Sequence, residues 1–303
     1  MNGSAFDCLI VGGGPAGLSA AAYLARFRRK VMVIDDRRSR ARWISSVRNY
    51  PGFPQGISGQ QLLANIYAQA SQHGAIVQPG TVLELRHDET GFVAATDAER
   101  FTAACVLLAT GVEDNFPRTP GFSEQAILND RIRLCPVCDA YEFIDQRIGV
   151  WGHADRAVKE ALFLRPYSSR ITVIAAGART VGDAERKLAD AGIAIVESEV
   201  VRVEHSKDDI ALIHGNGSAS RFDGVYLAMG SQARSPLAIG LGAEINDAGC
   251  LIVDAHQETT APGLYSAGDV VDELNQISVA IGHAAIAATA IHNRLAEQFQ
   301  ERS

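Results

Sequence analysis

The fold of this chain is decided by the stretch FDCLIVGGGPAG, residues 6–17. Residues 6–11 form a short apolar run, which is typical of a buried parallel strand. The six residues that follow match the pattern G-x-G-x-x-G. Residues 18–26 are rich in Ala and Leu and predict a helix, and residues 31–34 predict a second strand that ends at Asp35. The stretch therefore predicts a strand, a glycine turn, a helix and a second strand.

Each part of this unit has a reason in nucleotide binding. Gly12, Gly14 and Gly17 let the backbone approach a pyrophosphate at a helix N-terminus, and Asp35 is placed to accept a hydrogen bond from a ribose 2′-hydroxyl. The alternative is a glycine-rich turn with a purely structural role, because a single G-x-G-x-x-G is a weak signal. The strand–turn–helix–strand frame, with an acid at its end, favours a dinucleotide site.

Residues 147–176 repeat this unit without a gap, so that Gly12 maps onto Gly152 and Leu24 onto Leu164. Such an internal duplication predicts a second domain of the same type. We therefore expect an α/β fold with two Rossmann-like nucleotide-binding domains.

The second copy departs from the first at the positions that contact a nucleotide. Gly14 maps onto Ala154 and Asp35 onto Ala175, so the close approach to a pyrophosphate and the ribose acceptor are both lost. A 2′-phosphate requires an Arg in that place, and the first charge there is Arg179. The second domain is thus predicted to keep the fold while losing much of the chemistry that holds a nicotinamide cofactor.

Cysteine and aspartate lie together in the stretch CPVCD, residues 135–139. Two thiols with two residues between them close a small disulfide ring when they lie on the first turn of a helix, where the free N–H groups favour a thiolate. Asp139 is placed to move the proton that dithiol chemistry requires. The alternatives are half of a zinc site or two buried structural thiols, and no second Cys/His pair stands at zinc-ligand spacing. We predict redox-active thiols at Cys135 and Cys138, and no metal site.

Composition excludes several classes of function. The formal net charge of -7 over 303 residues counts against a nucleic-acid partner, which requires clustered Lys and Arg in excess. No uninterrupted run of about 18 apolar residues predicts a membrane span, and the N-terminus does not read as a signal peptide. The five cysteines do not form a secreted disulfide framework, so we expect a cytoplasmic protein.

Taken together, these residues resemble the low-molecular-weight thioredoxin reductase family of flavoproteins. The motifs that carry the resemblance span nearly the whole chain in the family's order; they are GGGPAG at 12–17, NYPG at 49–52, ATG at 109–111, CPVCD at 135–139, and GD at 268–269 followed by QI at 276–277. The resemblance implies a discontinuous FAD-binding domain, residues 1–115 and 245–303. It also implies an inserted NAD(P)-binding-like domain, residues 116–244, that carries the dithiol, and it implies a homodimer.

By this resemblance, Cys138 faces the flavin and exchanges electrons with it, Cys135 reacts with the substrate sulfur, and Asp139 gives or takes the proton. Asp269 is expected to bond the ribityl chain, and the helix that starts near Gln276 to stabilise negative charge on the reduced flavin. The full set of residues implied to bind the cofactor is Gly12, Gly14, Pro15, Ala16, Gly17, Asp35, Asp36, Asn49, Ala109, Thr110, Gly111, Gly268, Asp269, Gln276 and Ile277.

Departures from the family pattern set the predicted function. Ala176 and Gly177 replace the family's Arg pair, and residues 36–42 replace its usual Gly-Gly-Gln run. We predict an FAD-dependent thiol–disulfide oxidoreductase that acts on a thioredoxin-like protein or a small dithiol or disulfide, without conventional NADPH use. The alternatives are a dithiol oxidase that uses O2, an NADPH-dependent thioredoxin reductase and a non-catalytic flavin redox sensor. His283 lies on the terminal helix, where it is either packed or close to the flavin or the thiols.

Overall fold

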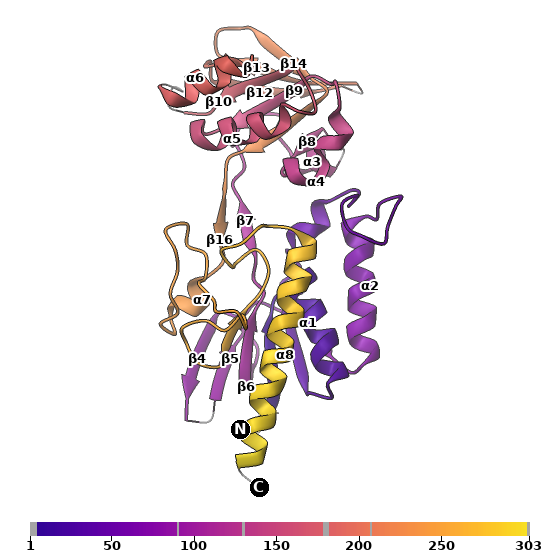
Figure 1. The fold of residues 1–303 in the computed structure, drawn as a ribbon, viewed down its shortest axis with the longest axis vertical. Helices are drawn as coiled ribbons and strands as arrows, with labels where there is room; N and C mark the ends of the chain where they lie inside the picture. Colours follow the sequence, from indigo (N-terminus) through magenta and orange to yellow (C-terminus); the bar gives the residue numbers. More distant parts are fainter. Residues whose placement is uncertain (1–4, 90, 129–130, 178–181, 207, 302–303) are drawn as a thin grey trace. The chain divides into compact units, whose positions relative to one another are not determined.

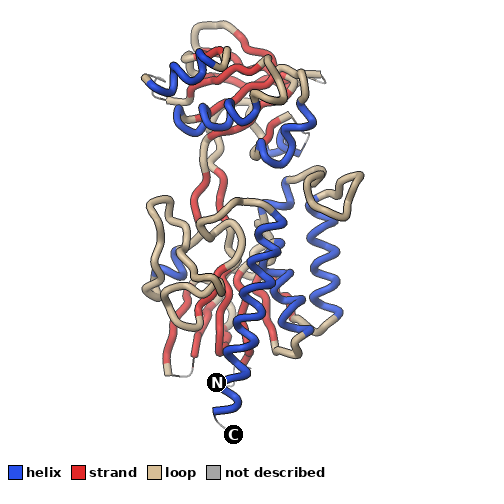
Figure 2. The backbone as a smooth tube through the Cα atoms, viewed as in Figure 1, coloured by secondary structure: helices blue, strands red, loops and turns tan. Residues whose placement is uncertain are grey.

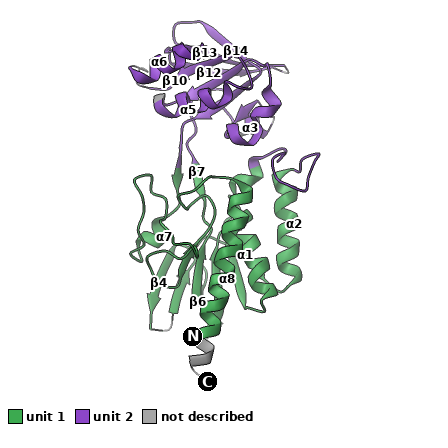
Figure 3. Cartoon of the chain, in the orientation of Figure 1, with its two compact units in different colours: residues 1–42, 58–113, 232–303 green, residues 43–57, 114–231 purple. Residues whose placement is uncertain are grey.

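The chain forms two compact units, shown in Figure 3. A computed structural model describes residues 5–89, 91–128, 131–177, 182–206 and 208–301. Unit 1 consists of residues 1–42, 58–113 and 232–303, and unit 2 consists of residues 43–57 and 114–231. Each unit has its own sheet and its own hydrophobic core.

Unit 1 is built on a largely parallel sheet with the strand order β3-β2-β1-β6-β5-β4, and β17 pairs with β6. Figure 1 labels β4, β5 and β6 of this sheet. The strands are β1 (Ala5–Val11), β2 (Val31–Asp35), β3 (Ile76–Pro79), β4 (Glu84–Asp88), β5 (Gly91–Ala95), β6 (Arg100–Leu108) and β17 (Leu264–Ser266). The pairs of β1 with β2 and β6 are parallel, whereas β4, β5 and β6 pair antiparallel. The helices are α1 (Pro15–Arg26), α2 (Gly59–Gln72), α7 (Pro236–Ile239) and α8 (Ile277–Glu301), with a 3-10 turn η1 (Arg40–Trp43).

Alternation along the strands gives this sheet two buried faces. Cys8 and Ile10 of β1 pack with Ala21 of α1 and Ala284 of α8 on one face. Leu9 of β1 packs on the other face, with side chains of β4, β5 and the segment before α8. Small residues on both helices let α1 and α8 approach the sheet and each other closely, as Figure 2 shows. The nucleotide-type turn is thus held between two packed layers.

Unit 2 has a five-stranded parallel sheet in the order β11-β10-β9-β15-β8, and a separate antiparallel sheet of β12, β13 and β14. These strands are β8 (Ile132–Arg133), β9 (Ile148–Gly152), β10 (Ile171–Ala175), β11 (Ala194–Val196), β12 (Val200–His205), β13 (Ile210–His214), β14 (Ala219–Phe222) and β15 (Gly224–Ala228). The helical segments are α3 (Glu124–Leu128), α4 (Pro136–Asp139), η2 (Ala140–Phe143), α5 (Ala154–Leu164) and α6 (Asp183–Asp190). Val150 faces the core with α5 and α6, and Trp151 faces the core with the antiparallel sheet.

The predicted duplication is confirmed down to the register of the strands. In unit 1, Cys8 of β1 lies opposite Val31 of β2. In unit 2, Ile148 of β9 lies opposite Ile171 of β10, which is the same pairing in the repeated sequence. Both units continue from the first strand through a glycine turn into a helix. The α/β class with two Rossmann-like units is therefore the observed fold.

The observed units differ from the predicted domain limits in two places. Residues 232–244 belong to unit 1, because Ala238 and Ala243 are buried in its core with Leu251. Residues 43–57 belong to unit 2, where Trp43 packs on a core cluster and Arg48 pairs with Glu142 at 3.3 Å. Strands β7 (Val112–Asp114) and β16 (Ser231–Ala233), where the chain passes between the units, pair with each other.

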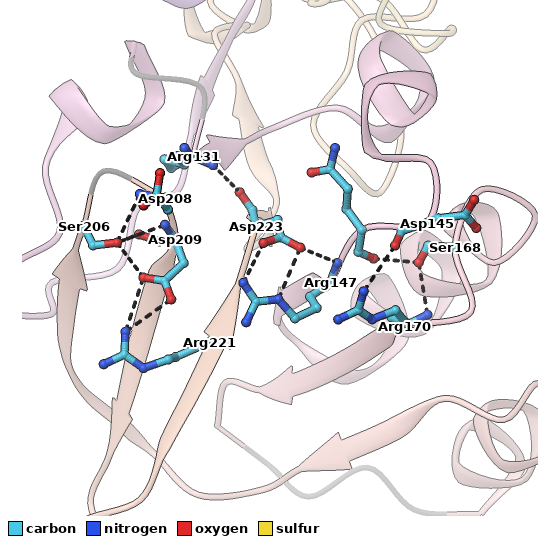
Figure 4. Close-up of polar contacts among 11 residues, drawn as sticks. Arg131, Asp145, Arg147, Ser168, Arg170, Ser206, Asp208, Asp209, Arg221 and Asp223 are labelled. Carbon is cyan, nitrogen blue, oxygen red and sulfur yellow. Dashed lines mark hydrogen bonds and ion pairs between the residues drawn. The ribbon is translucent and has the colours of Figure 1, made fainter.

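Charged side chains join the starts of the strands in unit 2 (Figure 4). The guanidinium of Arg147, just before β9, donates from Nη2 to Asp223 Oδ1 at 2.6 Å, and its backbone N–H donates to Asp223 Oδ2 at 2.8 Å. Arg131 donates to the Asp223 carbonyl at 3.1 Å, and Arg221 bonds Asp209 at 3.2 Å. The bonds from Arg147 and Arg131 hold Asp223 directly before β15, and so fix where that strand begins.

Gly152→Ala is expected to destabilise unit 2, because a Cβ at Gly152 would lie 2.2 Å from the Ala228 carbonyl oxygen of the neighbouring strand. Backbone must then shift, at a cost of about 1–3 kcal/mol in the free energy of unfolding. Gly282→Ala is the control. A Cβ there meets no described atom within 4 Å, and alanine is favoured over glycine in a helix interior by about 0.5–1 kcal/mol. Urea unfolding measures both changes, and a Gly152→Ala protein as stable as the parent would contradict the packing described here.

Candidate active site

The two cysteines of the CPVCD stretch form a disulfide in unit 2. Cys135 stands at the N-cap of α4, Pro136 is its first residue, and Cys138 completes the single turn. The Cα atoms of Cys135 and Cys138 are 5.4 Å apart, and both residues are half-buried. Pro136 is favoured at this position because its fixed φ suits the first turn of a helix and its missing N–H is not needed there. The turn thus holds both sulfurs at bonding distance.

Asp139 follows the disulfide directly and has a partner on each carboxylate oxygen. The hydroxyl of Tyr226, on β15, donates to Asp139 Oδ1 at 2.7 Å. The guanidinium of Arg133, at the end of β8, donates from Nη1 to Asp139 Oδ2 at 3.0 Å. The carboxylate is therefore fixed from two strands of the unit 2 sheet.

The protonation of Asp139 is set by opposing effects. Burial raises the pKa of Asp139 above its ordinary value, while the positive charge of Arg133 and the hydrogen bond from Tyr226 act to lower it. Burial and the Asp139 carboxylate together raise the pKa of Tyr226 strongly. Tyr226 therefore keeps its proton and serves as a hydroxyl in the neutral range.

An aromatic ring holds both partners of Asp139. The Arg133 guanidinium lies over the ring of Phe143, 5.1 Å from its centroid. Phe143 and Tyr226 make an edge-to-face pair with ring centroids 5.9 Å apart. A Cβ at Gly224 would lie 2.3 Å from the Phe143 ring, so this glycine makes room for it. Arg133, Phe143 and Tyr226 thus form one packed cluster around the carboxylate.

In unit 1, the glycine turn lies against the end of β6. Gly12 has a φ of +108°, and a Cβ there would lie 2.3 Å from the Ala109 carbonyl oxygen. A Cβ at Gly17 would lie 1.9 Å from the Gly12 carbonyl oxygen. Helix α1 then begins at Pro15, with Gly14 as its N-cap and no side chain capping it. The free N–H groups of its first turn are the donors that a pyrophosphate requires.

The acids after β2 have distinct contacts. Asp35 accepts hydrogen bonds on Oδ1 from the backbone N–H groups of Gly13 at 3.1 Å and of Arg37 at 3.0 Å. This places its carboxylate beside the glycine turn. Asp36 instead accepts from Arg38 Nε at 2.8 Å and lies 3.9 Å from Arg234.

Three further predicted segments lie in the same unit. Ala109 donates from its N–H to the Val11 carbonyl at 2.8 Å, and Thr110 Oγ1 donates to the Arg234 carbonyl at 2.6 Å. A Cβ at Gly268 would lie 3.0 Å from the Ala16 Cβ and 3.7 Å from the Ala280 Cβ. Gly268 is therefore close to both α1 and the first turn of α8. Asp269 pairs with Arg40 at 3.6 Å. Gly111 lies between β6 and β7, Gln276 directly precedes α8, and Ile277 is the first residue of that helix.

These residues fit a dinucleotide. Gly12 and Gly17 let the backbone of β1, β6 and α1 pack closely around the turn. The Asp35 carboxylate then lies beside the uncapped N-terminus of α1, which places a ribose acceptor next to donors for a pyrophosphate. One predicted cofactor residue lies elsewhere: Asn49 falls in unit 2, in the same unit as Cys135, Cys138 and Asp139. His283, on α8, is buried, and its Nδ1 atom has no hydrogen-bond partner within the described part of the chain.

Unit 2 has a cavity of about 530 Å³ at the carboxyl ends of its parallel strands. It is lined by Asn115, Phe116, Pro117, Thr119, Trp151, His153, Ala175, Ala176, Gly177, Glu197, Glu199, Val200 and Met229. Two of these residues are acidic and none is Lys or Arg, whereas Arg179 lies outside the described residues. His153 Nδ1 is 3.0 Å from the Ala176 carbonyl oxygen, so its ring rests on the turn after β10.

Sequence reasoning missed Arg133, Phe143 and Tyr226. Arg133 stands two residues before Cys135, and its proximity was a signal that was available. Tyr226 lies in a buried strand 87 residues from Asp139, and nothing in its local sequence marks it. Within the described residues, no group of three His, Cys, Asp or Glu side chains is arranged to hold a metal ion. Over the same residues, no helix is both long and apolar enough to cross a bilayer.

Comparison with known proteins identifies the family. The pyridine nucleotide-disulphide oxidoreductase family matches residues 6–284. A thioredoxin reductase of Treponema pallidum is 31% identical and aligns with 94% of this chain and 95% of its own length. The crystal structure of HlmI superposes with a TM-score of 0.91 at 26% identity, covering 98% of this chain and 95% of that one. A thioredoxin reductase structure from Streptococcus pyogenes gives 0.88 at 26% identity, covering 97% and 99%. The chain therefore belongs to the pyridine nucleotide-disulphide oxidoreductase family, among its thioredoxin reductase-like members.

Proposed function

We propose that this protein is an FAD-dependent thiol–disulfide oxidoreductase that exchanges electrons between Cys135 and Cys138 and a bound flavin, without conventional use of NADPH. The observation that carries the proposal is the Cys135–Cys138 disulfide with a buried, doubly bonded Asp139 directly after it. The relatives named thioredoxin reductases support the same chemistry. A purely structural disulfide requires no such carboxylate.

FAD is assigned to unit 1. The glycine turn and the first turn of α1 would hold its pyrophosphate, Asp35 its adenosine ribose and Asp269 its ribityl chain. When bound, FAD accepts or supplies two electrons. The first turn of α8 is assigned to stabilise negative charge on its ring, since a helix N-terminus carries a partial positive charge. Asn49 is the one proposed cofactor residue in unit 2.

The cysteine pair carries out the exchange with the substrate. A thiolate of a substrate dithiol attacks Cys135, the bond between Cys135 and Cys138 breaks, and Cys138 leaves as a thiolate that takes a proton. The second substrate thiol then displaces Cys135. The substrate has lost two electrons and two protons and has gained an S–S bond, while the protein holds two thiols. Asp139 is the group that gives or takes a proton at these sulfurs, and the reverse sequence reduces a disulfide.

The cavity of unit 2 supports the proposal that ordinary NADPH use is lost. It lies at the carboxyl ends of β9 and β10, where a Rossmann domain holds a dinucleotide. Ala175 stands where a ribose acceptor is expected, and Glu197 and Glu199 oppose the charge of a phosphate. We further propose a cytoplasmic homodimer whose partner is a thioredoxin-like protein or a small dithiol or disulfide.

Anaerobic titration of the flavin-loaded protein tests the proposed function. A small dithiol such as dithiothreitol is expected to bleach the flavin absorbance, and stoichiometric NADPH or NADH is expected to leave it unchanged over seconds. Cys138→Ser is expected to abolish bleaching by the dithiol, because the disulfide that receives the electrons is gone. Cys250→Ser is the matched control, since Cys250 is a half-buried free thiol of unit 1.

Each outcome of this titration decides one part of the proposal. Rapid bleaching by NADPH would contradict the assignment of unit 2. Unchanged dithiol reactivity in Cys138→Ser would contradict the role of the cysteine pair. After bleaching by the dithiol, admission of air separates two directions of use: recovery of colour with formation of peroxide supports a dithiol oxidase, and a stable bleached state supports a reductase fed by another electron donor.

Asp139→Asn is expected to slow the reaction with dithiol by about 100-fold or more, because proton transfer by a positioned group contributes that much or more. The amide keeps the shape of the side chain and its bond to Tyr226. Asp209→Asn is the control: it makes the same change at a carboxylate of unit 2 that bonds Ser206 and Arg221 and is not beside the disulfide. Stopped-flow bleaching rates measure both variants, and equal rates in Asp139→Asn and the parent would remove Asp139 from the mechanism.

A further inference from the structure

We propose that Tyr226 and Arg133 are positioning residues that hold the Asp139 carboxyl for proton transfer to the cysteine pair and set the pH range in which it transfers. This inference rests on the proposed function, in which Asp139 exchanges a proton with the sulfurs. It goes beyond that function because it gives a role to two residues on strands β8 and β15, outside the CPVCD segment, and neither residue is close in sequence to a proposed cofactor residue.

The contacts fix the carboxyl rather than merely touching it. Tyr226 binds one oxygen at 2.7 Å and Arg133 binds the other at 3.0 Å, so rotation of the Asp139 side chain breaks at least one bond. Tyr226 is fully buried on β15, and this strand lies between β9 and β8 in the sheet. Strand β8 leads directly into the segment that carries the two cysteines. Arg133 is held over the Phe143 ring, and that ring in turn packs edge-on against Tyr226. Neither partner is free to move away from Asp139.

The two partners differ in what they do when Asp139 changes its protonation. A tyrosine hydroxyl both donates and accepts, so Tyr226 can bond the carboxylate as a donor and the neutral carboxylic acid as an acceptor. Arg133 is a donor only and carries a permanent positive charge, so it favours the carboxylate. Tyr226 therefore keeps the carboxyl in place in both states, and Arg133 limits how firmly the carboxyl holds its proton.

The charged and titratable groups around Asp139 come from four elements. Arg133 on β8 and Tyr226 on β15 oppose the rise that burial causes in the pKa of Asp139. Glu142 on η2 adds to that rise, and its own charge is paired with Arg48 at 3.3 Å. The cysteines of α4 are joined in the disulfide and carry no charge in this state. Loss of either partner is thus expected to raise the pKa of Asp139 further.

These residues serve one proton transfer within the thiol–disulfide exchange between the substrate dithiol and the Cys135–Cys138 disulfide. A substrate dithiol gives two electrons and two protons to the disulfide; its two S–H bonds break, its own S–S bond forms, and Cys135 and Cys138 become thiols. The first substrate thiol loses its proton to solvent and attacks as a thiolate. Neutral Asp139 gives its proton to Cys138 when the protein disulfide breaks and regains a proton from the second substrate thiol, and Cys135 takes a proton from solvent when it is displaced. The reaction in this direction therefore requires both a substrate thiolate and neutral Asp139. Because the thiolate fraction grows as pH rises, the quantity that falls through the pKa of Asp139 is the rate divided by that fraction.

The test is the pH dependence of disulfide reduction in the flavin-loaded protein, and its readout is the alkylation of the cysteines rather than the absorbance of the flavin. Dithiothreitol is added anaerobically, the reaction is quenched with an alkylating reagent, and labels on the peptide that contains Cys135 and Cys138 are counted by mass spectrometry. Each rate is divided by the fraction of dithiothreitol that is thiolate at that pH. In Asp139→Asn the decline of this normalised rate of disulfide reduction at high pH is expected to be lost, and this loss identifies the decline with the titration of the Asp139 carboxyl.

Tyr226→Phe and Arg133→Gln are expected to move this decline to higher pH, by about one pH unit for the single hydrogen bond of Tyr226 and by more for the charged Arg133. Tyr226→Phe keeps the ring that packs on Phe143, so the fold is retained. Arg133→Lys keeps the positive charge and is therefore expected to have a midpoint pH between those of Arg133→Gln and the parent. Tyr167→Phe, in a ring pair with Phe163 of the same unit, is the control and is expected to leave the profile unchanged.

The inference is overturned if the decline of the normalised rate has the same midpoint pH in both single variants, Tyr226→Phe and Arg133→Gln, as in the parent, while Asp139→Asn still abolishes the decline. An unchanged profile in Asp139→Asn itself would instead contradict the role of Asp139 in the proposed function. If labelling of Cys135 and Cys138 follows the predicted pH shifts but the flavin does not bleach, the positioning role stands and the electron exchange with FAD fails.

Discussion

The structure depends on a close contact between a glycine at the end of one strand and the backbone of the neighbouring strand, and both units contain it. In unit 1, a Cβ at Gly12 would lie 2.3 Å from the carbonyl oxygen of Ala109, directly after β6. In unit 2, a Cβ at Gly152 would lie 2.2 Å from the carbonyl oxygen of Ala228, at the end of β15. Only glycine allows the strands to close up here and the chain to turn into the next helix. The duplicated sequence therefore yields two sheets with the same register, and in each the chain passes through a glycine into the next helix.

The two copies share this constraint but differ in what stands beside it. In unit 1 the turn meets the Asp35 carboxylate, so the arrangement suits a dinucleotide. In unit 2 the corresponding strand ends at Ala175, and the cavity there has acidic rather than basic walls. The same sheet of unit 2 instead holds a carboxylate beside a disulfide, through side chains of β8 and β15. One copy of the fold thus places an acid beside a glycine turn, and the other places a buried carboxylate directly after a disulfide.

Sequence predicted what depends on local pattern. The apolar runs, the glycines and Asp35 act over a few residues, so the α/β class, the duplication and the glycine turn were all readable. The unit boundaries were not, because residues 232–244 join unit 1 through the packing of single alanines in its core. Of the two partners of Asp139, Arg133 was within reach as a near neighbour of Cys135 in the sequence, whereas Tyr226 was not. Tyr226 is brought to Asp139 by the pairing of β15 beside β8, a tertiary contact that no spacing in the chain reports.

The most direct test of the account asks whether electrons placed on the flavin reach the cysteines. The flavin-loaded protein is reduced by light with a non-thiol donor, in the absence of air, with enough electrons for both the flavin and the disulfide. It is then quenched with an alkylating reagent and digested. The account predicts two labels on the peptide that holds Cys135 and Cys138 after illumination and none in the dark. A fully bleached flavin with that peptide still unlabelled would contradict it.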